Sequence, residues 1–326
     1  MASRLLAAII TANDMNRITR KVQHLTEIAW HEPAFWLVAI AQYHHLQRYR
    51  VLRTMFAKMY RQIQTDMSAF TTPSWAAFNT SLEQSLLPIP PYSFLRDQTI
   101  SSTMVMTKGG SILREQLHWL KREWQDLVHA LHEDPVGHPS IANWRHLVSH
   151  NTVHQMYHLG RFLKSTNANM QAIRRIVEWG GGYGNFARLF IRQAPRVSYT
   201  IIDTPLLCTL QWLYLSSVFG SEAVKLVTRP NQSVMDSGIT IIPVQWFNSF
   251  NLSADLFVST WAISESPHHL QEAVARTWFD AKHLLIGFQD SRPAFPDAGN
   301  IGDLARKSGA VIEDLPHMSG NHYAFR

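Results

Sequence analysis

Apolar residues recur every three or four positions through the first half of the chain. This spacing predicts helices over residues 27–61, with one break at Pro33, and over residues 112–131. A third helix is predicted over residues 141–164, because a Pro-Ser pair just before it can supply the N-cap. We therefore expect residues 1–167 to form an all-helical N-terminal region.

Two further segments of this half have a weaker pattern. Residues 73–91 are rich in turn-forming residues and are predicted to be a surface loop. Residues 4–10 are apolar and are predicted to be the first helix rather than a signal segment, because no clear cleavage site follows. The longest apolar runs, 5–12 and 34–41, are far shorter than the roughly 20 residues that span a bilayer, so no membrane span is expected.

After residue 168 short β-branched runs alternate with helical ones. Continuous apolar strands separated by helices predict a mostly parallel, doubly wound α/β sheet over residues 168–326. The predicted strands are 175–178, 198–203, 239–243, 255–259 and 283–288, and the clearest helices are 185–193 and 206–219. Two late strands, 310–313 and 322–325, have no helix between them and predict an antiparallel hairpin at the sheet edge.

Composition narrows the class of protein. Of the 326 residues, 46% are hydrophobic and 17% are charged, with 15 Gly and 15 Pro, which excludes a disordered, collagen-like or low-complexity chain. The single cysteine, Cys208, cannot form an internal disulfide, so we expect a reducing, cytoplasmic compartment. A net charge of +6 is mild for this length and does not indicate a nucleic-acid partner.

A glycine-rich turn follows the first strand of the second half and opens a helix. It contains Gly180, Gly181, Gly182 and Gly184, and Glu178 precedes it. Glycines allow a tight turn and a close approach to a ligand, and the helix N-terminus offers free N–H groups. The next strand ends at Asp203, where a carboxylate can accept hydrogen bonds from the hydroxyls of a ribose.

The spacing of the glycines distinguishes between nucleoside ligands. A dinucleotide fingerprint, G-x-G-x-x-G, would need a glycine at the position of Asn185, whereas this chain has E-x-G-x-G-x-G. An acid before the glycines suits a ligand that has a cationic methionine end and no pyrophosphate. The pattern therefore predicts S-adenosylmethionine as the cofactor.

Three segments carry a family resemblance. Residues 176–190 resemble motif I of class I S-adenosylmethionine-dependent methyltransferases, whose fold is Rossmann-like. Residues 199–215 and 255–267 are similar to the second and fourth motifs of the sugar O-methyltransferase family. The resemblance implies methyl transfer to a hydroxyl of a sugar or glycoconjugate, with the helical region contributing substrate or oligomer contacts.

The resemblance also implies roles for single residues. Asp203 would hold the ribose, the turn after Glu178 would pass beside the methionine, and Val244 and Gln245 would flank the adenine. Ser259 is expected near the cofactor, at a place where relatives often carry Asn.

Two groups of residues are candidates for the general base that a sugar hydroxyl needs. The first is Glu265 with His268 and His269, in the loop after the fourth strand. The alternative is that Glu265 caps the following helix and the two histidines are solvated.

The second group is a row of histidines at intervals of four, predicted to share a helix face: His146, His150, His154 and His158. Such a row can be buried and hydrogen-bonded, can face a substrate, or can chelate a metal. No carboxylate stands at ligand spacing within the helix, so no metal is predicted. His150 and His154 are the members that we expect to contact substrate.

Three other functions remain open. These are methylation of another small-molecule or natural-product hydroxyl, a nicotinamide oxidoreductase, and a non-catalytic binding protein with a cofactor fold.

Overall fold

The computed structural model describes residues 33–106 and 110–326. The helix expected over residues 4–10 and the start of the one expected over 27–61 lie outside the described residues.

The segment predicted as one helix broken at Pro33 forms three. These are α3 (Pro33–Ala41), α4 (Tyr43–Leu52) and α5 (Phe56–Ile63). The helix is interrupted at Gln42, whose backbone is not helical and whose side chain Nε2 donates to the carbonyl of Glu133 at 2.6 Å. A long-range contact therefore ends a helix that the local pattern would have continued.

The predicted loop at residues 73–91 is wrong for most of its length, because α6 (Pro73–Leu86) occupies it. Thr72 caps this helix by accepting from the backbone N–H of Trp75. Proline is favoured at the first helical position, since its missing N–H would have had no partner there. The short helix α7 (Gln98–Thr103) follows and is capped by Asp97.

The third predicted helix begins nine residues late, and the N-terminal region is not all helical. α8 (Gly110–Glu123) and α9 (Gln125–His129) lead into a small antiparallel pair, β1 (Ile141–Asn143) and β2 (Val148–Ser149). Only then does α10 (His150–Thr166) begin, with Ser149 as its N-cap. His146 therefore lies in the turn between β1 and β2, where its N–H donates to Asn143, so the predicted row of four histidines on one helix is wrong.

The second half confirms the predicted doubly wound sheet. Its strands are β3 (Arg175–Trp179), β4 (Ser198–Asp203), β5 (Val224–Leu226), β6 (Gly238–Pro243), β7 (Leu256–Thr260), β8 (His283–Gln289), β9 (Val311–Asp314) and β10 (Asn321–Phe325). The spatial order is β5-β6-β4-β3-β7-β8-β10-β9. All pairs from β5 to β8 are parallel, and β10 lies antiparallel to both β8 and β9. The hairpin at the edge is confirmed, whereas β5 was too short for the pattern to reveal.

Helices cover both faces of this sheet. They are α11 (Asn185–Gln193), α12 (Pro205–Phe219), α13 (His268–Trp278) and α14 (Asn300–Lys307). Neighbouring strand residues enter different hydrophobic clusters, so that Ile176 packs on the α10–α12 side and Val177 packs on the α13–α14 side. Side chains that alternate between two buried faces explain the continuous apolar runs of these strands.

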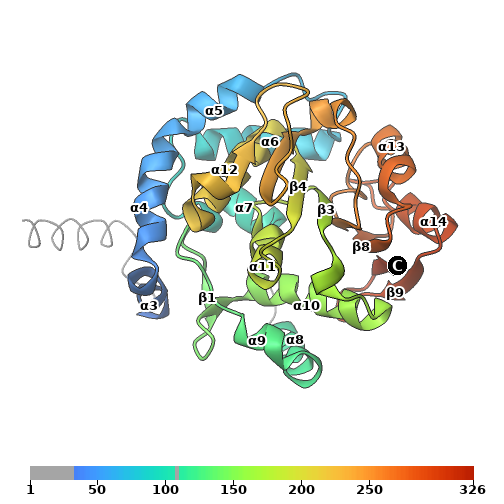
Figure 1. The fold of residues 1–326 in the computed structure, drawn as a ribbon, viewed down its shortest axis with the longest axis horizontal. Coiled ribbons are helices and arrows are strands. Elements are labelled where there is room, and N and C mark those ends of the chain that lie inside the picture. Colours follow the sequence, from blue (N-terminus) through green and yellow to red (C-terminus); the bar gives the residue numbers. More distant parts are fainter. Residues whose placement is uncertain (1–32, 107–109) are drawn as a thin grey trace, which may run out of the picture.

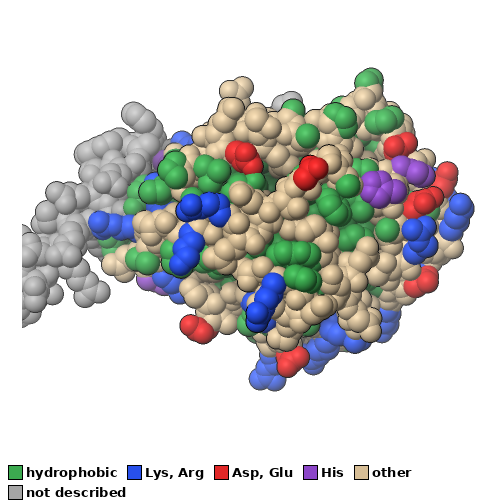
Figure 2. All heavy atoms as spheres, turned by 90° about the horizontal axis from the view of Figure 1, so that it is seen from above, with side chains coloured by type: hydrophobic (Ala, Val, Ile, Leu, Met, Phe, Trp, Pro, Cys, Tyr) green, Lys and Arg blue, Asp and Glu red, His purple; other side chains and the backbone are tan. Residues whose placement is uncertain are grey.

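The helices before the sheet share its core. The cluster that contains Ile176 also contains Tyr49 from α4 and Leu120 from α8. In Figure 1, α4 and α5 lie beside α12, while α13 and α14 lie at the other end near β8. Figure 2 shows hydrophobic, basic and acidic side chains interspersed over one face of the molecule. Among the described residues, no helix is both long and apolar enough to cross a membrane.

Candidate functional site

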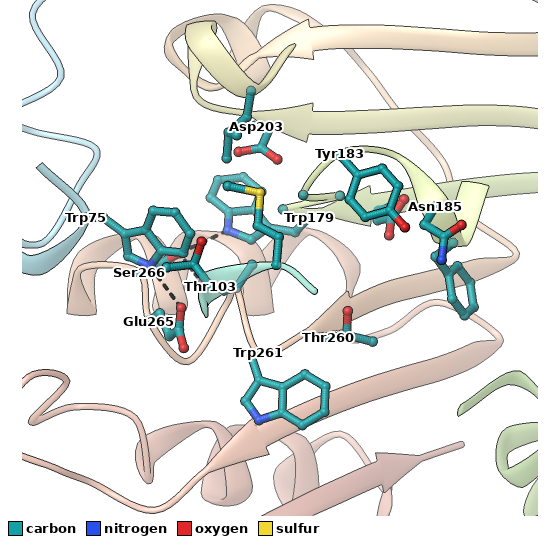
Figure 3. Close-up of a pocket in the computed structure, with 18 of the residues that line it drawn as sticks. Trp75, Thr103, Trp179, Tyr183, Asn185, Asp203, Thr260, Trp261, Glu265 and Ser266 are labelled. Carbon is teal, nitrogen blue, oxygen red and sulfur yellow. Dashed lines mark hydrogen bonds between the residues drawn. The ribbon is translucent and has the colours of Figure 1, made fainter. Parts of the chain in front are cut away.

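A cavity of about 370 Å³ opens at the carboxyl ends of β3, β4, β7 and β8. Its walls include the glycine turn, Asp203 and residues 260–262, and Figure 3 shows that Trp75 and Glu265 also line it. In open α/β sheets, ligands bind outside the carboxyl ends of the strands. The volume lies within the range of small-molecule sites.

The glycine turn is fixed by its packing as well as by its backbone. Gly180 has a φ of +73°, and a Cβ there would lie 2.0 Å from the Cβ of Ala262. Gly180, Gly181 and Gly182 line the cavity. Gly184 lies outside it and serves as the left-handed N-cap of α11, where a Cβ would lie 2.9 Å from Leu215. Three of the four predicted glycines thus face the ligand space, and the fourth starts the helix.

Asp203 ends β4 and reaches the cavity wall. Its Oδ2 accepts from Gln211 Nε2 at 2.7 Å, and its Oδ1 accepts from the Thr204 N–H at 2.7 Å. Burial raises the pKa of Asp203 to about 7, even though hydrogen bonds from Thr204, Gln211 and the glycine turn act in the opposite direction.

Glu178 is a second buried carboxyl beside the first. Its Oε2 accepts from the hydroxyl of Tyr199 at 2.9 Å. Burial raises the pKa of Glu178 to about 8; the bond from Tyr199 opposes this effect, and the nearby Asp203 adds to it. In the part of the chain that is described, no Lys or Arg forms an ion pair with either carboxyl. A cationic ligand in the cavity would stabilise the charged form of both.

Other predicted cofactor residues divide between the cavity and the protein interior. Val244 lines the cavity. Gln245 points away, since its Nε2 donates to the carbonyl of Ile63 at 2.8 Å. Ser259 is buried outside the cavity, where its hydroxyl donates to the Trp179 carbonyl at 2.9 Å and accepts from the Ile263 N–H at 3.0 Å. Gln245 and Ser259 therefore make hydrogen bonds within the protein and do not line the cavity.

Glu265 lines the cavity and does not cap a helix, because Pro267 is the N-cap of α13. Its Oε2 accepts from the indole N–H of Trp75 at 2.9 Å, and its Oε1 accepts from Gln289 Nε2 at 3.1 Å. Burial raises the pKa of Glu265 to about 7, against the effects of those two bonds and of the Arg292 charge. A carboxyl that titrates near neutral pH suits proton transfer.

The two histidines that follow Glu265 in the sequence do not share its position. His268 is half exposed at the start of α13, 3.5 Å from Glu272, with its Nδ1 3.2 Å from Asn300 Nδ2. His269 is exposed on the same helix. Neither residue lines the cavity.

Of the predicted histidine row, only His154 lines the cavity. Its Nδ1 lies 2.8 Å from Gln116 Nε2, and its ring stacks on Trp261 with centroids 6.0 Å apart. Burial lowers the pKa of His154 to about 3, with a smaller contribution from His150. His150 is buried outside the cavity, and His158 is buried with its Nδ1 2.6 Å from the Tyr323 hydroxyl. No cluster of three or more metal-binding side chains occurs among the described residues.

Trp261 has a backbone conformation that non-glycine residues rarely adopt. Its φ is +68°, directly after β7, and its indole N–H donates to Asn321 at 2.8 Å. Strained residues of this kind cluster at functional sites.

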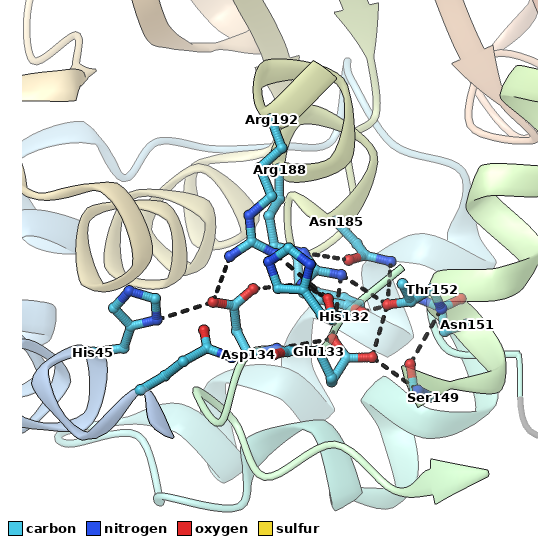
Figure 4. Close-up of polar contacts among 12 residues, drawn as sticks. His45, His132, Glu133, Asp134, Ser149, Asn151, Thr152, Asn185, Arg188 and Arg192 are labelled. Carbon is cyan, nitrogen blue, oxygen red and sulfur yellow. Dashed lines mark hydrogen bonds and ion pairs between the residues drawn. The ribbon is translucent and has the colours of Figure 1, made fainter. Parts of the chain in front are cut away.

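A buried ionic network includes residues of α11, the helix that the glycine turn opens, and was not predicted (Figure 4). Arg188 on α11 pairs with Asp134 and with Glu133, the latter at 3.2 Å, and its Nε donates to Asn185 at 3.0 Å. Arg192 also pairs with Asp134, at 2.8 Å. Burial alone would raise the pKa of Asp134, but Arg188, a hydrogen bond from His45 and Arg192 hold it well below its usual range.

This network joins the two halves of the chain. Glu133 and Asp134 precede β1, whereas Arg188 lies on the helix that the glycine turn opens. Asn185, held by Arg188, lines the cavity. An adjacent pair of acids and two arginines four residues apart on a helix were the signal in the sequence, but their distance along the chain concealed the pairing.

Comparison with known proteins gives structural likenesses only. No protein-family model matches the sequence, and no curated protein matches it. The structure is similar to "PigF with SAH" at a TM-score of 0.36 and 13% identity, covering 88% of this chain and 98% of that one. It is similar to the mitomycin 7-O-methyltransferase MmcR at a TM-score of 0.35 and 14% identity, covering 100% and 99%. For the N-methyltransferase NodS from Bradyrhizobium japonicum WM9 the values are 0.35 and 13%, covering 53% and 92%.

At these scores the fold assignment depends on the strand order itself. The parallel β5-β6-β4-β3-β7-β8 arrangement, closed by an antiparallel β10, matches the predicted architecture. The chain has a Rossmann-like, doubly wound fold.

Proposed function

We propose that the protein is an S-adenosylmethionine-dependent O-methyltransferase that acts on a hydroxyl of a sugar or glycoconjugate. The observation that carries the proposal is the pair of buried carboxyls, Glu178 and Asp203, beside a glycine turn at the ends of parallel strands. S-adenosylmethionine brings an ammonium and a sulfonium to such a site, whereas the pyrophosphate of a dinucleotide would bring negative charge to two acids.

The residues present fit this cofactor. Asp203 would accept from the ribose hydroxyls, and the turn over residues 180–182 would lie along the methionine portion. Glu178 lies behind that turn, with its Oε2 3.2 Å from the place of a Cβ on Gly181, and would attract the positive charge. Val244 would pack against the adenine. The bound cofactor supplies an electrophilic methyl group.

The protein must then align the acceptor hydroxyl, exclude water and remove a proton. Glu265 is the better of the two candidate bases, because its pKa of about 7 matches neutral conditions. Its donors, Trp75 and Gln289, orient both oxygens. His154 is the second candidate, and its pKa of about 3 makes it a weaker base.

Aromatic and amide side chains at the far end of the cavity support a sugar acceptor. Trp75 and Trp261 offer aromatic surface, and Gln289 and Asn321 offer hydrogen-bonding groups. Apolar faces with a few placed polar groups are typical of sites that fix a polar ring. Residues 199–215 and 255–267 point to the same class through their resemblance to sugar O-methyltransferases.

A different small-molecule hydroxyl is the second candidate, and one observation favours it. Met104, Met106 and Met318 line the cavity together with Phe70. Methionine adapts to flat apolar ligands. An acceptor panel with sugars and phenols would separate the two classes.

Calorimetry tests the cofactor assignment. We expect S-adenosylhomocysteine to bind the wild-type protein and NAD not to bind. The Asp203→Ala variant should lose at least about tenfold in affinity, equivalent to about 1.4 kcal/mol. The exposed Asp236→Ala variant is the matched control and should bind normally. Tight NAD binding, or an unchanged affinity in Asp203→Ala, would overturn the proposal.

A further inference from the structure

Arg292 lines the cavity and has no partner for its charge. It lies on the loop after β8, and among the described residues its guanidinium makes no ion pair and no hydrogen bond. The loop itself is fixed: Arg292 and Phe295 exchange backbone hydrogen bonds of 3.1 and 2.9 Å, and the Gly299 N–H donates to Ser291 Oγ at 3.1 Å. Arg292 is solvent-exposed, and the anchored loop thus presents an unpaired cation that is accessible both from solvent and from the cavity.

The acids nearby are engaged elsewhere. Both oxygens of Glu265 accept from Trp75 and Gln289, so Glu265 feels the charge of Arg292 without pairing with it. Asp290, on the same loop, lies 3.1 Å from His322 Nε2. The other two acids of the cavity, Glu178 and Asp203, belong to the glycine turn and the end of β4.

We propose that Arg292 binds an anionic group of the acceptor, a carboxylate or a phosphate, so that the substrate is an acidic sugar. This inference depends on the proposed function and narrows its acceptor class. The guanidinium fork matches both anions through paired N–H donors. An acceptor held there lies against the wall that carries Glu265, which would receive the hydroxyl proton.

The cofactor has a carboxylate of its own, and the experiment must separate the two anions. Protein saturated with S-adenosylhomocysteine is titrated with D-glucuronate, glucose 1-phosphate and D-glucose. We expect at least one of the charged sugars to bind at least tenfold more tightly than glucose, with a preference that falls as salt rises.

The Arg292→Gln variant should lose that preference and keep its affinity for S-adenosylhomocysteine. Arg276→Gln is the matched control, an exposed arginine whose one ion pair within residues 33–106 and 110–326 is with Glu272 on α13. If Arg292→Gln weakens S-adenosylhomocysteine binding instead, Arg292 serves the cofactor carboxylate and the inference is wrong.

Failure of the inference is distinct from failure of the proposed function. Normal S-adenosylhomocysteine binding without any preference for a charged sugar, or without binding of any sugar, would overturn the role of Arg292 alone. Absence of S-adenosylhomocysteine binding to the wild-type protein would overturn both.

Discussion

The two ends of the cavity are built in different ways. The end with Glu178 and Asp203 comes from one continuous strand-turn-helix-strand segment. The end with Glu265 is assembled from α6, α10, and the loops after β7 and β8, which are far apart in the sequence. A short segment with fixed spacing suits recognition of a constant cofactor. Residues that come from separate loops and helices allow an acceptor site to change its side chains while the sheet stays the same.

The ionic network beside α11 joins the two halves of the chain, and removing its central cation, Arg188, should have the largest effect. Arg188→Met leaves Glu133 and Asp134 buried with less compensating charge. Breaking a buried ion pair on one side typically costs about 3–5 kcal/mol. Urea unfolding should show a loss of this size in the free energy of unfolding.

The exposed Arg276→Met variant is the control for that loss and should unfold like the wild type. A loss below about 1 kcal/mol in Arg188→Met would mean that the two halves hold together without the network.

Glu265→Gln separates the two ends by chemistry. If Glu265 is the base, methyl transfer should fall by about 10²-fold or more, because the amide cannot take the proton. Binding of S-adenosylhomocysteine should be unchanged, since Glu265 lies at the end of the cavity that we propose holds the acceptor. His154→Gln should have the smaller effect on rate, and the reverse order would identify His154 as the base.

The pH dependence of methyl transfer by the wild-type protein and by Glu265→Gln gives a second test of the base. Glu265 acts in its deprotonated form and has a pKa of about 7. At saturating S-adenosylmethionine, the wild-type kcat/KM for the acceptor should therefore rise as pH increases towards 7 and level off above it, and Glu265→Gln should lack this rise. An identical rise in the variant would assign the titration to another group.

Gly180→Ala tests the end of the cavity that contains the glycine turn, which we propose holds the cofactor. The added Cβ would lie 2.0 Å from Ala262, at a φ of +73°. The control is Gly309→Ala, whose φ of +87° carries the same strain in open space. Gly309→Ala should lose about 1–3 kcal/mol of stability from the strained backbone. Gly180→Ala should lose more, because the clash with Ala262 adds to the same strain. Only Gly180→Ala should also weaken binding of S-adenosylhomocysteine, and equal affinities in the two variants would contradict a ligand-facing turn.

The difference between the two ends of the cavity also explains which residues of the site could be predicted from the sequence. The glycine turn, Glu178 and Asp203 were predictable because short, continuous apolar runs locate the strands and the cavity-lining residues follow at fixed offsets. The doubly wound sheet was predictable for the same reason. Both predictions depend only on the spacing of residues that are close together in the sequence.

The predictions from the sequence were wrong where a distant contact or a helix cap determines the local secondary structure. Ser149, not Ser140, caps α10, and this choice removes His146 from the helix. The proline of α6 starts a helix where the turn-rich composition indicated a loop. Trp75 and Arg188 could not be assigned to the cavity or its support, because their partners lie far away in the sequence.

Proton release on cofactor binding tests the central claim most directly. The claim is that Glu178 and Asp203 become charged when a cationic ligand binds beside them. Their raised pKa values of about 8 and about 7 mean that both carboxyls bind protons near neutral pH in the free protein. Calorimetry of S-adenosylmethionine binding at pH 7.5, in buffers of different ionisation enthalpy, measures the protons exchanged. We predict net release from the wild-type protein and a smaller release from Asp203→Asn. Binding without release, or with proton uptake, would contradict the account.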